Sequence, residues 1–221
     1  MAPDGSGGVV EPKPYINEEE DRMKIRTVEY VGTLVDPTAP LPAKLPQVAF
    51  AGRSNVGKSS LINTILGRTR SKVARVSATP GKTQALNFYR VNDAFLLVDL
   101  PGFGYARVPM EVKGGWKALI EGYMGRPDGP AAVVHLLDVR RDPGPEDIQM
   151  LEYLVKLGIP ALLILTKVDK FSKSRKIQRV EELVTNLGID REQIIPFSSK
   201  TGEGKELLLA ALGDLLDGLH A

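Results

Sequence analysis

The sequence predicts an α/β fold of three layers, in which a mostly parallel sheet has helices on both faces. Apolar segments alternate with amphipathic, helix-like segments through the second half of the chain, as in sheets built from strand–helix–strand units. Apolar runs such as residues 161–165 are nearly continuous, which indicates strands buried on both faces. Residues 50–62 combine a strand end, a glycine-bounded loop and a helix start. In open α/β sheets ligands lie beyond the carboxyl ends of the strands, so this stretch is the reference point for the rest of the chain.

The first half of the chain departs from plain alternation in three places. Residues 36–46 contain four prolines and predict an extended connector. Residues 68–84 are polar, have no sustained period and are too long for an ordinary connection, which favours a functional loop. Residues 86–91 and 94–99 flank Asn92-Asp93, and they predict an antiparallel hairpin at the sheet edge. The other expected elements are strands at 26–35, 47–51, 131–137, 161–165 and 194–197, a helix from the glycine-bounded loop to about 67, and helices at 111–124, 146–157, 172–187 and 205–219.

Length and composition limit the class of protein. A chain of 221 residues with 43% hydrophobic residues suits one globular domain, and we expect a flexible tail at 1–24 and this domain at 25–221. The absence of Cys excludes disulfides and thiolate metal sites and fits a reducing cytosol. No apolar run approaches the roughly 20 residues of a membrane span, and the N-terminus lacks the layout of a signal peptide. We therefore expect a cytoplasmic monomer, and its net charge of +2 is too small to indicate a partner.

The glycine-bounded loop fits the pattern GxxxxGK[ST]. This spacing lets backbone N–H groups surround a phosphate while Lys58 reaches its outer oxygens, and the following helix directs its positive end at the same anion. Ser59 would place a hydroxyl on Mg²⁺, which prefers oxygen ligands. Apolar residues before the loop and at helical spacing after it provide the context that the motif requires. The nucleotide-binding residues expected here are Gly52, Arg53, Ser54, Asn55, Val56, Gly57, Lys58, Ser59 and Ser60.

A second motif follows the apolar residues 95–98. Asp99 would emerge at the carboxyl edge of the sheet, where it could hold Mg²⁺ directly or through water. The N–H group of Gly102 could contact a γ-phosphate. The alternative is an ordinary turn at a strand end, and the phosphate loop one hairpin earlier favours the functional interpretation. The nucleotide-binding residues expected in this motif are Asp99, Leu100, Pro101 and Gly102.

Two further motifs indicate recognition of guanine. Asp169 can accept hydrogen bonds from the ring N–H and the exocyclic amine of guanine, a donor pair that adenine lacks, while the Lys167 stem packs along the base. A buried polar site left unpaired rejects the wrong ligand strongly, so this carboxylate would select GTP over ATP. A turn after the last strand can supply N–H groups to the guanine carbonyl. The residues expected here are Thr166, Lys167, Val168 and Asp169, followed by Phe197, Ser198, Ser199 and Lys200.

The order of these motifs resembles the Ras-like GTPase superfamily. Residues 79–84, Thr-Pro-Gly-Lys-Thr-Gln, look like the first switch loop of the TrmE-Era group. This resemblance makes Thr83 the hydroxyl that ligates Mg²⁺ in the GTP-bound form and adds Gly81, Lys82, Gln84 and Ala85 to the nucleotide contacts. With the motifs at 52–59, 99–106 and 147–150, the chain from about Tyr30 onward resembles the EngB (YsxC/YihA) family of bacterial ribosome-assembly GTPases.

That resemblance implies a bacterial cytoplasmic factor in late maturation of the large ribosomal subunit, often needed for normal cell division and septation. It implies that Lys58, Thr83 and Gly102 carry the hydrolysis of GTP to GDP. Phe103 stands where many GTPases have the glutamine that orients water. Because its ring cannot form those hydrogen bonds, we expect slow hydrolysis by the chain alone, with water held by backbone, another side chain or a partner. Tyr105 is a less favoured substitute whose other role is packing.

Asn55, the two basic groups and the function of the whole chain each keep more than one interpretation. Asn55 matches the asparagine that ligates K⁺ in potassium-stimulated relatives, or it simply tolerates a tight loop conformation. Two basic groups either bind RNA, as the resemblance favours, or form a solvated face. Competing functions for the whole chain are a small-molecule kinase on the same loop and a binding module without significant turnover. We expect His135 and Trp116 to be structural. The basic groups are Arg68, Arg70, Lys72, Arg75 and Lys82, and Lys170, Lys173, Arg175, Lys176 and Arg179.

Overall fold

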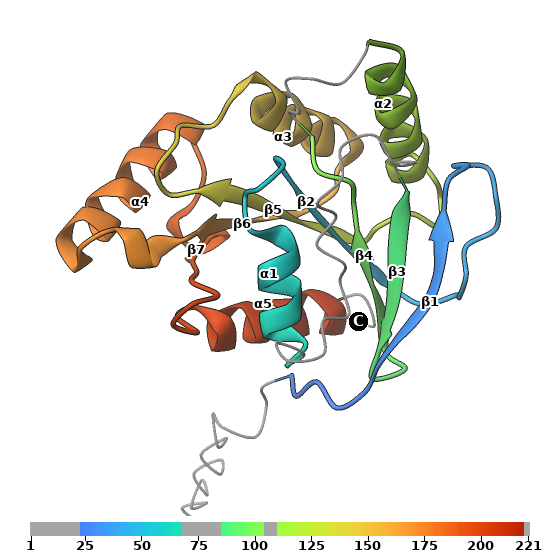
Figure 1. Ribbon diagram of the computed structural model, residues 1–221, viewed down its shortest axis with the longest axis horizontal. Coiled ribbons are helices and arrows are strands. Elements are labelled where there is room, and N and C mark those ends of the chain that lie inside the picture. The colour runs from blue at the N-terminus through green and yellow to red at the C-terminus, as the bar shows by residue number, and fades with distance from the viewer. Residues whose placement is uncertain (1–22, 68–84, 104–109, 219–221) are drawn as a thin grey trace, which may run out of the picture.

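One seven-stranded sheet with helices on both faces organises the part of the chain that the structure describes (Figure 1). The structure is a computed structural model, and it describes residues 23–67, 85–103 and 110–218. The strands are β1 (Val28–Leu34), β2 (Gln47–Gly52), β3 (Leu86–Val91), β4 (Phe95–Asp99), β5 (Ala132–Asp138), β6 (Ala161–Thr166) and β7 (Ile194–Pro196). The helices are α1 (Lys58–Ile65), α2 (Met110–Met124), α3 (Pro145–Leu157), α4 (Lys173–Leu187) and α5 (Lys205–Asp217), with short 3₁₀ turns at Val168–Lys170 and Arg191–Gln193.

The strand order is β1-β3-β4-β2-β5-β6-β7, and only β3 runs against its neighbours in this sheet. The predicted α/β fold with a mostly parallel sheet is therefore confirmed. The apolar runs of the sequence explain this arrangement, because every residue of β2, β4 and β5 is buried. Strands of this kind need a helix layer on each face.

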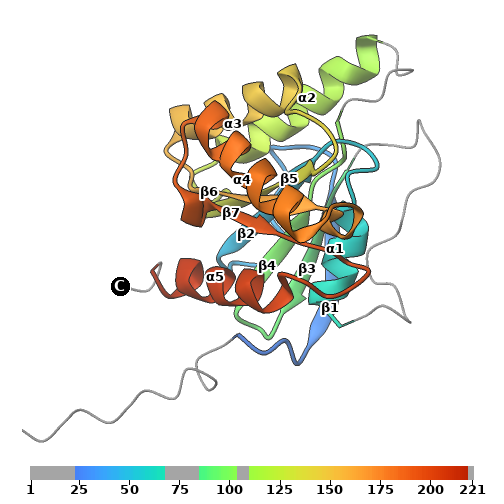
Figure 2. The ribbon, with the colours of Figure 1, turned by 90° about the vertical axis from the view of Figure 1, so that its left-hand side faces the viewer.

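The two helix layers divide the core into separate sides. Figure 2 shows α1 and α5 on one side of the sheet and α2, α3 and α4 on the other. Successive side chains of β5 point to opposite sides of the sheet. Val134 packs in the cluster with α1 and α5, and Val133 packs in the cluster with α2 and α3. A third cluster, which includes Leu165 and Val180, lies under α4. The period of two along the strands thus accounts for the three layers.

The predicted hairpin is formed by β3 and β4. Both turn residues have positive φ, 52° at Asn92 and 53° at Asp93, as a two-residue hairpin turn requires. The edge of the sheet, however, is β1, which pairs with β3 and contains an irregularity between Tyr30 and Gly32. The Asn92 side chain accepts from the N–H groups of Arg26 and Thr27 at 2.7 and 3.1 Å. The hairpin turn therefore also fixes the segment that leads into β1.

The carboxyl ends of five strands meet along one rim of the sheet. In register, Phe50 of β2 is paired with Asp99 of β4, and Asp138 of β5 with Thr166 of β6. The predicted motifs follow β2, β4, β6 and β7 directly, so the fold brings them to this rim. In the described segments, none of the helices combines the length and the apolar character needed to cross a membrane.

Candidate nucleotide site

The loop between β2 and α1 has the tight backbone that a phosphate-binding loop needs. Asn55 has φ 62° and Gly57, the N-cap of α1, has φ 112°, both in the region that favours Gly and Asn. At Gly52 a Cβ atom would lie 3.0 Å from Val56 Cγ1, so the loop closes on itself only because this position is glycine. The first N–H groups of α1 have no partners within the helix. They are therefore available to an anion at the rim.

Lys58 and Asp99 come together at the centre of this rim. The Lys58 ammonium group donates to Asp99 Oδ1, and the two side chains are only 11% and 8% exposed. This contact joins the first residue of α1 to the last residue of β4. Ser59 follows Lys58 in the chain, so the sequence places a hydroxyl next to the residue that pairs with the Asp99 carboxylate. Hydroxyl and carboxylate oxygens are donors that Mg²⁺ prefers. This donor set fits a magnesium ion bound with phosphates.

The turn after Asp99 lies directly against the phosphate loop. Ser54 donates its backbone N–H to the Phe103 carbonyl at 2.8 Å, and Phe103 donates to the Gly52 carbonyl at 3.3 Å. A Cβ atom at Gly102 would lie 3.2 Å from both Cα and N of Ser54, which is closer than backbone atoms permit without movement. The Phe103 side chain is only 4% exposed. Its ring is packed into the protein, consistent with the expectation that it does not orient a water molecule.

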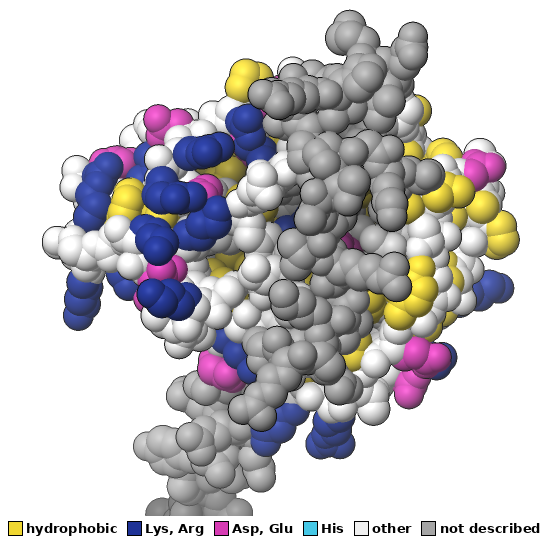
Figure 3. Space-filling model, in the orientation of Figure 1, with side chains coloured by type: hydrophobic (Ala, Val, Ile, Leu, Met, Phe, Trp, Pro, Cys, Tyr) yellow, Lys and Arg dark blue, Asp and Glu magenta, His cyan; other side chains and the backbone are white. Residues whose placement is uncertain are grey.

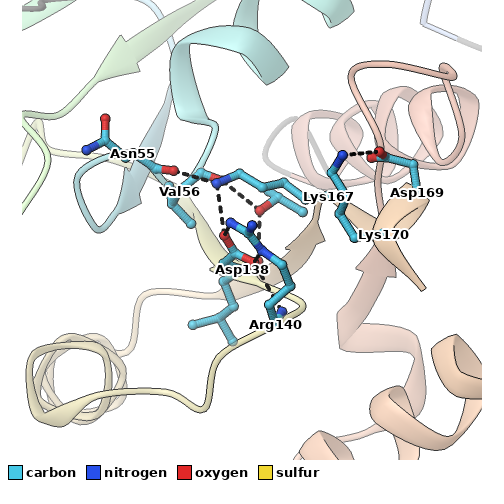
Figure 4. Close-up of polar contacts among 9 residues, drawn as sticks. Asn55, Val56, Asp138, Arg140, Lys167, Asp169 and Lys170 are labelled. Atoms are coloured by element: carbon cyan, nitrogen blue, oxygen red, sulfur yellow. Dashed lines mark hydrogen bonds and ion pairs between the residues drawn. The ribbon is translucent and has the colours of Figure 1, made fainter.

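The motif at the end of β6 holds the backbone of the phosphate loop (Figure 4). Thr166 Oγ1 donates toward the carbonyl groups of Val56 at 2.7 Å and Leu137 at 3.0 Å. The Lys167 ammonium group donates to the Asn55 carbonyl at 2.6 Å and to Asp138 Oδ2 at 2.9 Å. The contacts to Val56 and Asn55 join residues more than 100 positions apart in the sequence. The base-recognition motif and the phosphate loop are therefore one connected unit.

Asp169 is oriented by the turn that follows β7. Ser198 Oγ donates to Asp169 Oδ1 at 2.8 Å, and the same hydroxyl accepts from the N–H groups of Lys200 and Thr201 at 3.2 and 3.3 Å. The Ser198 hydrogen bond, together with the charge of Lys170 at 3.6 Å, lowers the pKa of the Asp169 carboxyl. The structure thus brings the third and fourth predicted motifs together, with an ionised carboxylate at their junction.

Asp138 is a residue of this rim that the sequence analysis did not single out. It ends β5 and accepts from Arg140 Nε and Nη2 at 2.9 and 2.7 Å, in addition to Lys167 (Figure 4). Burial raises the pKa of this carboxyl, but the hydrogen bonds from Arg140 and Lys167 outweigh it, so the pKa is well below its ordinary value. A cleft of about 160 Å³ lies beside these groups, lined also by Arg53 and Asn55. The signal that could have found Asp138 is its position at a strand end.

Some of the predicted residues lie outside the described residues. The first-switch residues Gly81, Lys82, Thr83 and Gln84 are outside, as are Tyr105 and the first basic group, and the Trp116 side chain is not described. Ala85 is described and immediately precedes β3. Ser60 lies exposed on α1, and Phe197 supplies the carbonyl that accepts from the Val168 N–H at 3.3 Å.

The second basic group is distributed among ion pairs rather than forming a uniform face. Figure 3 shows Lys and Arg side chains gathered over α4, with acidic side chains among them. Arg175 pairs with Glu182 at 2.7 Å, and Lys176 pairs with Glu203 at 2.5 Å. Arg179 is buried and donates to the carbonyl groups of Val139 and Arg141. Arg179 is therefore a structural residue, and including it in an exposed basic group was wrong because its guanidinium is buried against the loop after β5.

Comparison with known proteins agrees with this geometry. The family described as 50S ribosome-binding GTPase matches residues 47–167, more than half of the chain. A probable GTP-binding protein EngB from Gemmatimonas aurantiaca is 47% identical over 196 residues, covering 88% of this chain and 95% of that protein. A protein of the same name from Syntrophotalea carbinolica is 44% identical over 199 residues, again covering 88% and 95%.

Solved structures show the same fold. The crystal structure of a probable GTP-binding protein EngB superposes with a TM-score of 0.65 at 26% identity, covering 78% of this chain and 99% of that one. Aquifex aeolicus Era bound to GDP and aluminium fluoride gives a TM-score of 0.61 at 21% identity, with coverage of 78% and 57%; that likeness concerns the fold alone. From the sequence relatives and the matching motifs at the rim, the chain belongs to the EngB family of P-loop GTPases.

Proposed function

We propose that this GTPase is a switch in assembly of the large ribosomal subunit, acting in the bacterial cytoplasm as a monomer and needed for normal cell division and septation. The observation that carries the proposal is the meeting of Lys58–Asp99 and Asp169–Ser198 at one rim, which gives a site for both ends of a guanine nucleotide. The match to a family described as 50S ribosome-binding GTPase supports the choice of partner. The working domain in this proposal is residues 25–221, with a flexible tail at 1–24.

Phosphoryl transfer in this site is a matter of positioning and charge stabilisation. In this proposal Lys58 donates to the outer phosphate oxygens in exchange for Asp99. The N–H groups at the end of the loop and the start of α1 surround the phosphates, whereas those of Ser54 and Val56 are bonded within the protein. Ser59, Thr83 and Asp99, the last directly or through water, would hold Mg²⁺, which would neutralise charge on the phosphate oxygens. The Gly102 N–H donates to the γ-phosphate, so its position depends on whether that phosphate is present.

Base selection is assigned to the opposite end of the rim. Asp169 accepts from the ring N–H and the amine of guanine, while Lys167 packs along the ring. Ser198 already holds one oxygen of Asp169 at 2.8 Å, so the carboxylate loses little freedom when the base binds. Backbone groups of residues 197–200 face the guanine carbonyl in this assignment. The rival small-molecule kinase would bind ATP at least as well as GTP, and calorimetry with both nucleotides decides between the two functions.

We propose that hydrolysis is slow in the isolated protein and is stimulated by K⁺ or by the ribosome, because Phe103 cannot orient water. The Asn55 side chain is exposed and its φ of 62° keeps both interpretations of this residue open. Asn55→Gly separates them, since glycine accepts this φ but removes the amide. If the amide ligates K⁺, exchange of K⁺ for Na⁺ slows the unmodified protein and leaves Asn55→Gly unaffected. Equal turnover of the unmodified protein in both salts contradicts the potassium proposal.

The ribosomal role is tested by cosedimentation with large subunits in GDP and in a non-hydrolysable GTP analogue, each over a range of salt. We expect binding in the GTP form that weakens steeply with salt, because contacts to RNA phosphates release counterions. Comparable binding in both nucleotide forms instead favours a binding module whose nucleotide is a structural ligand. Lys173→Ala is an informative variant, because Lys173 is exposed on the face of α4 that carries the second basic group.

A further inference from the structure

A buried histidine and aspartate connect the phosphate loop to the turn after β4. His135 is fully buried on β5, in register with Ala51 near the end of β2. Alternation along β5 places it with Val133 on the side covered by α2 and α3, and Asp147 approaches it there from the first turn of α3. His135 is therefore paired with the residue just before Gly52, where the phosphate loop begins, and both polar side chains are shielded from solvent.

Asp147 is the centre of the polar part of this network. Its Oδ1 atom lies 3.1 Å from His135 Nε2, and its Oδ2 atom accepts from the Gly144 N–H at 2.8 Å. We assign Nε2 as the donor in this contact, with Asp147 Oδ1 as the acceptor. Oδ2 also lies 3.9 Å from Nη1 of Arg53, a residue of the phosphate loop. One buried carboxylate thus contacts the histidine and a phosphate-loop arginine at once.

The second part of the network is an aromatic contact. The His135 ring stacks on the Phe103 ring, with centroids 5.9 Å apart and an angle of 20° between the planes. Phe103 follows Gly102 in the chain, and its backbone is bonded to Gly52 and Ser54. Movement of the Phe103 ring would therefore move the Gly102 amide relative to the phosphate loop. The histidine acts on the part of the turn nearest the expected γ-phosphate.

We propose that His135 and Asp147 are positioning residues for GTP hydrolysis, holding the Gly102–Phe103 turn and Arg53 in one arrangement through the stack, the hydrogen bond and the ion pair. A residue chosen only to fill an apolar core would not need a polar ring. Nδ1 of His135 has no hydrogen-bond partner among the described residues, which is an energetic cost that an aliphatic side chain would avoid. The inference rests on the proposed role of the Gly102 amide.

Loss of the His135–Asp147 network should lower the rate of the chemical step more than the affinity for nucleotide. In the phosphate loop the network reaches Arg53 and the backbone of Gly52 and Ser54, but its hydrogen bonds and ion pairs described above do not involve Lys58, Thr166 or Asp169. GDP should therefore bind nearly as tightly without it. Displacement of a positioned group by about 1 Å can lower the rate by about 100-fold. Loss of the network should therefore separate turnover from affinity, which a general loss of stability would not do.

The test uses variants that each remove one part of the network in the full-length protein. His135→Phe keeps an aromatic ring against Phe103 but cannot donate to Asp147, and His135→Gln keeps a donor but loses the stack. Asp147→Asn keeps the shape and removes the charge facing Arg53. Val134→Ala is the control, because Val134 is the next buried residue of β5 and lies in the cluster on the opposite face. Melting temperature, GDP affinity and single-turnover hydrolysis are measured for each.

We expect single-turnover rates at least about tenfold lower in His135→Phe, His135→Gln and Asp147→Asn, with GDP affinity within about threefold. The double variant His135→Phe with Asp147→Asn should be no slower than either single variant, as for residues that act as a unit. Rates within about twofold of Val134→Ala, or rate and affinity falling in parallel with melting temperature as in that control, would overturn the inference. Asp147→Asn keeps the test decisive if His135→Phe does not fold.

Failure of this inference and failure of the proposed role of Gly102 give different results. If Gly102→Ala slows hydrolysis while the His135 and Asp147 variants do not, the amide matters and the network does not position it. If Gly102→Ala leaves hydrolysis unchanged, the proposed role of the amide is wrong. Slowing by the network variants in that case would have to act through Arg53, which Arg53→Lys would reproduce.

Discussion

The two ends of the nucleotide site are built differently. At the base end, Thr166, Lys167 and Asp169 are fixed by groups that belong to the fold, namely backbone carbonyls, Asp138 and Ser198. At the phosphate end, Lys58 and Asp99 satisfy each other. In the proposed function, the base end accepts guanine without losing an internal bond, whereas phosphates and Mg²⁺ would replace both partners of the Lys58–Asp99 ion pair. The base end is thus preorganised, whereas at the phosphate end the ligand's charges exchange with those of the Lys58–Asp99 pair.

This contrast explains why the phosphate end suits a switch. A buried ion pair left with one partner is costly, so removing the ligand charges restores the pair between α1 and β4. The base end has no such alternative, since its contacts are within the fold. We infer that guanine recognition holds the nucleotide in both forms, while the γ-phosphate alters only the side that contains Gly102. Four measurements test this division.

The largest effect is expected for Lys58→Ala. Without the ammonium group, the phosphates lose a charged donor and lie near an unpaired Asp99, so affinity for GTP and GDP should fall by more than about 100-fold. Calorimetric titration measures this loss. Lys156→Ala, an exposed lysine on α3, is the matched control and should leave affinity unchanged. Near-normal binding by Lys58→Ala would remove the distinction between the two ends.

The next effect tests the base end through Asp169→Asn. The amide cannot accept from both guanine donors, so we expect GTP affinity to fall by about 100-fold and preference to shift toward xanthosine triphosphate. Ser198→Ala should weaken GTP binding less, by about tenfold, because the carboxylate remains but loses its orienting hydrogen bond. Competition binding with both nucleotides provides the measurement. Unchanged selectivity in Asp169→Asn would show that guanine is recognised elsewhere.

Two glycine substitutions test the close contact between the turn after β4 and the phosphate loop. Gly102→Ala places a methyl group 3.2 Å from the Ser54 backbone, so the turn must move from the phosphate loop and single-turnover hydrolysis should fall about tenfold. Gly115→Ala, on α2, meets nothing within 4 Å and should raise the free energy of unfolding by about 0.5–1 kcal/mol. Urea unfolding and hydrolysis assays cover both. Equal behaviour of the two variants would contradict the close approach.

The smallest effect concerns Asp138 and acid. Because hydrogen bonds from Arg140 and Lys167 hold the pKa of Asp138 below its ordinary 3.8, its contribution to stability is present above that value and is lost as pH falls through the lower, folded-state pKa. Asp138→Asn should cost about 1 kcal/mol at neutral pH, allowing for solvent screening, and less as pH falls below about 4. Urea unfolding at several pH values tests this, with exposed Asp214→Asn as control. A pH-independent difference would refute the linkage.

Local motifs made most of the fold and the rim predictable. The phosphate loop carries its own glycine spacing, and Asp99 and Asp169 follow apolar strands, so their positions at the carboxyl edge needed only the rule for parallel sheets. Three features could not be predicted from local motifs, because they depend on contacts between residues far apart in the chain. The pairing of β1 outside the hairpin joins residues about 60 apart, Arg179 is buried by a loop from β5, and His135 finds its carboxylate on another element. Asp138 could have been predicted by the same edge rule.

Thr166 and Lys167 donate to the carbonyl groups of Val56 and Asn55, and these hydrogen bonds should couple local opening of the two segments. In the proposed site the base and the phosphates bind to backbone segments that these hydrogen bonds join, so binding at one end should affect both segments. Guanosine, which carries no phosphate, should slow deuterium uptake at residues 53–57 as well as at residues 166–169. A ligand bound at one end of the rim is therefore expected to reduce local opening of the backbone at the other end.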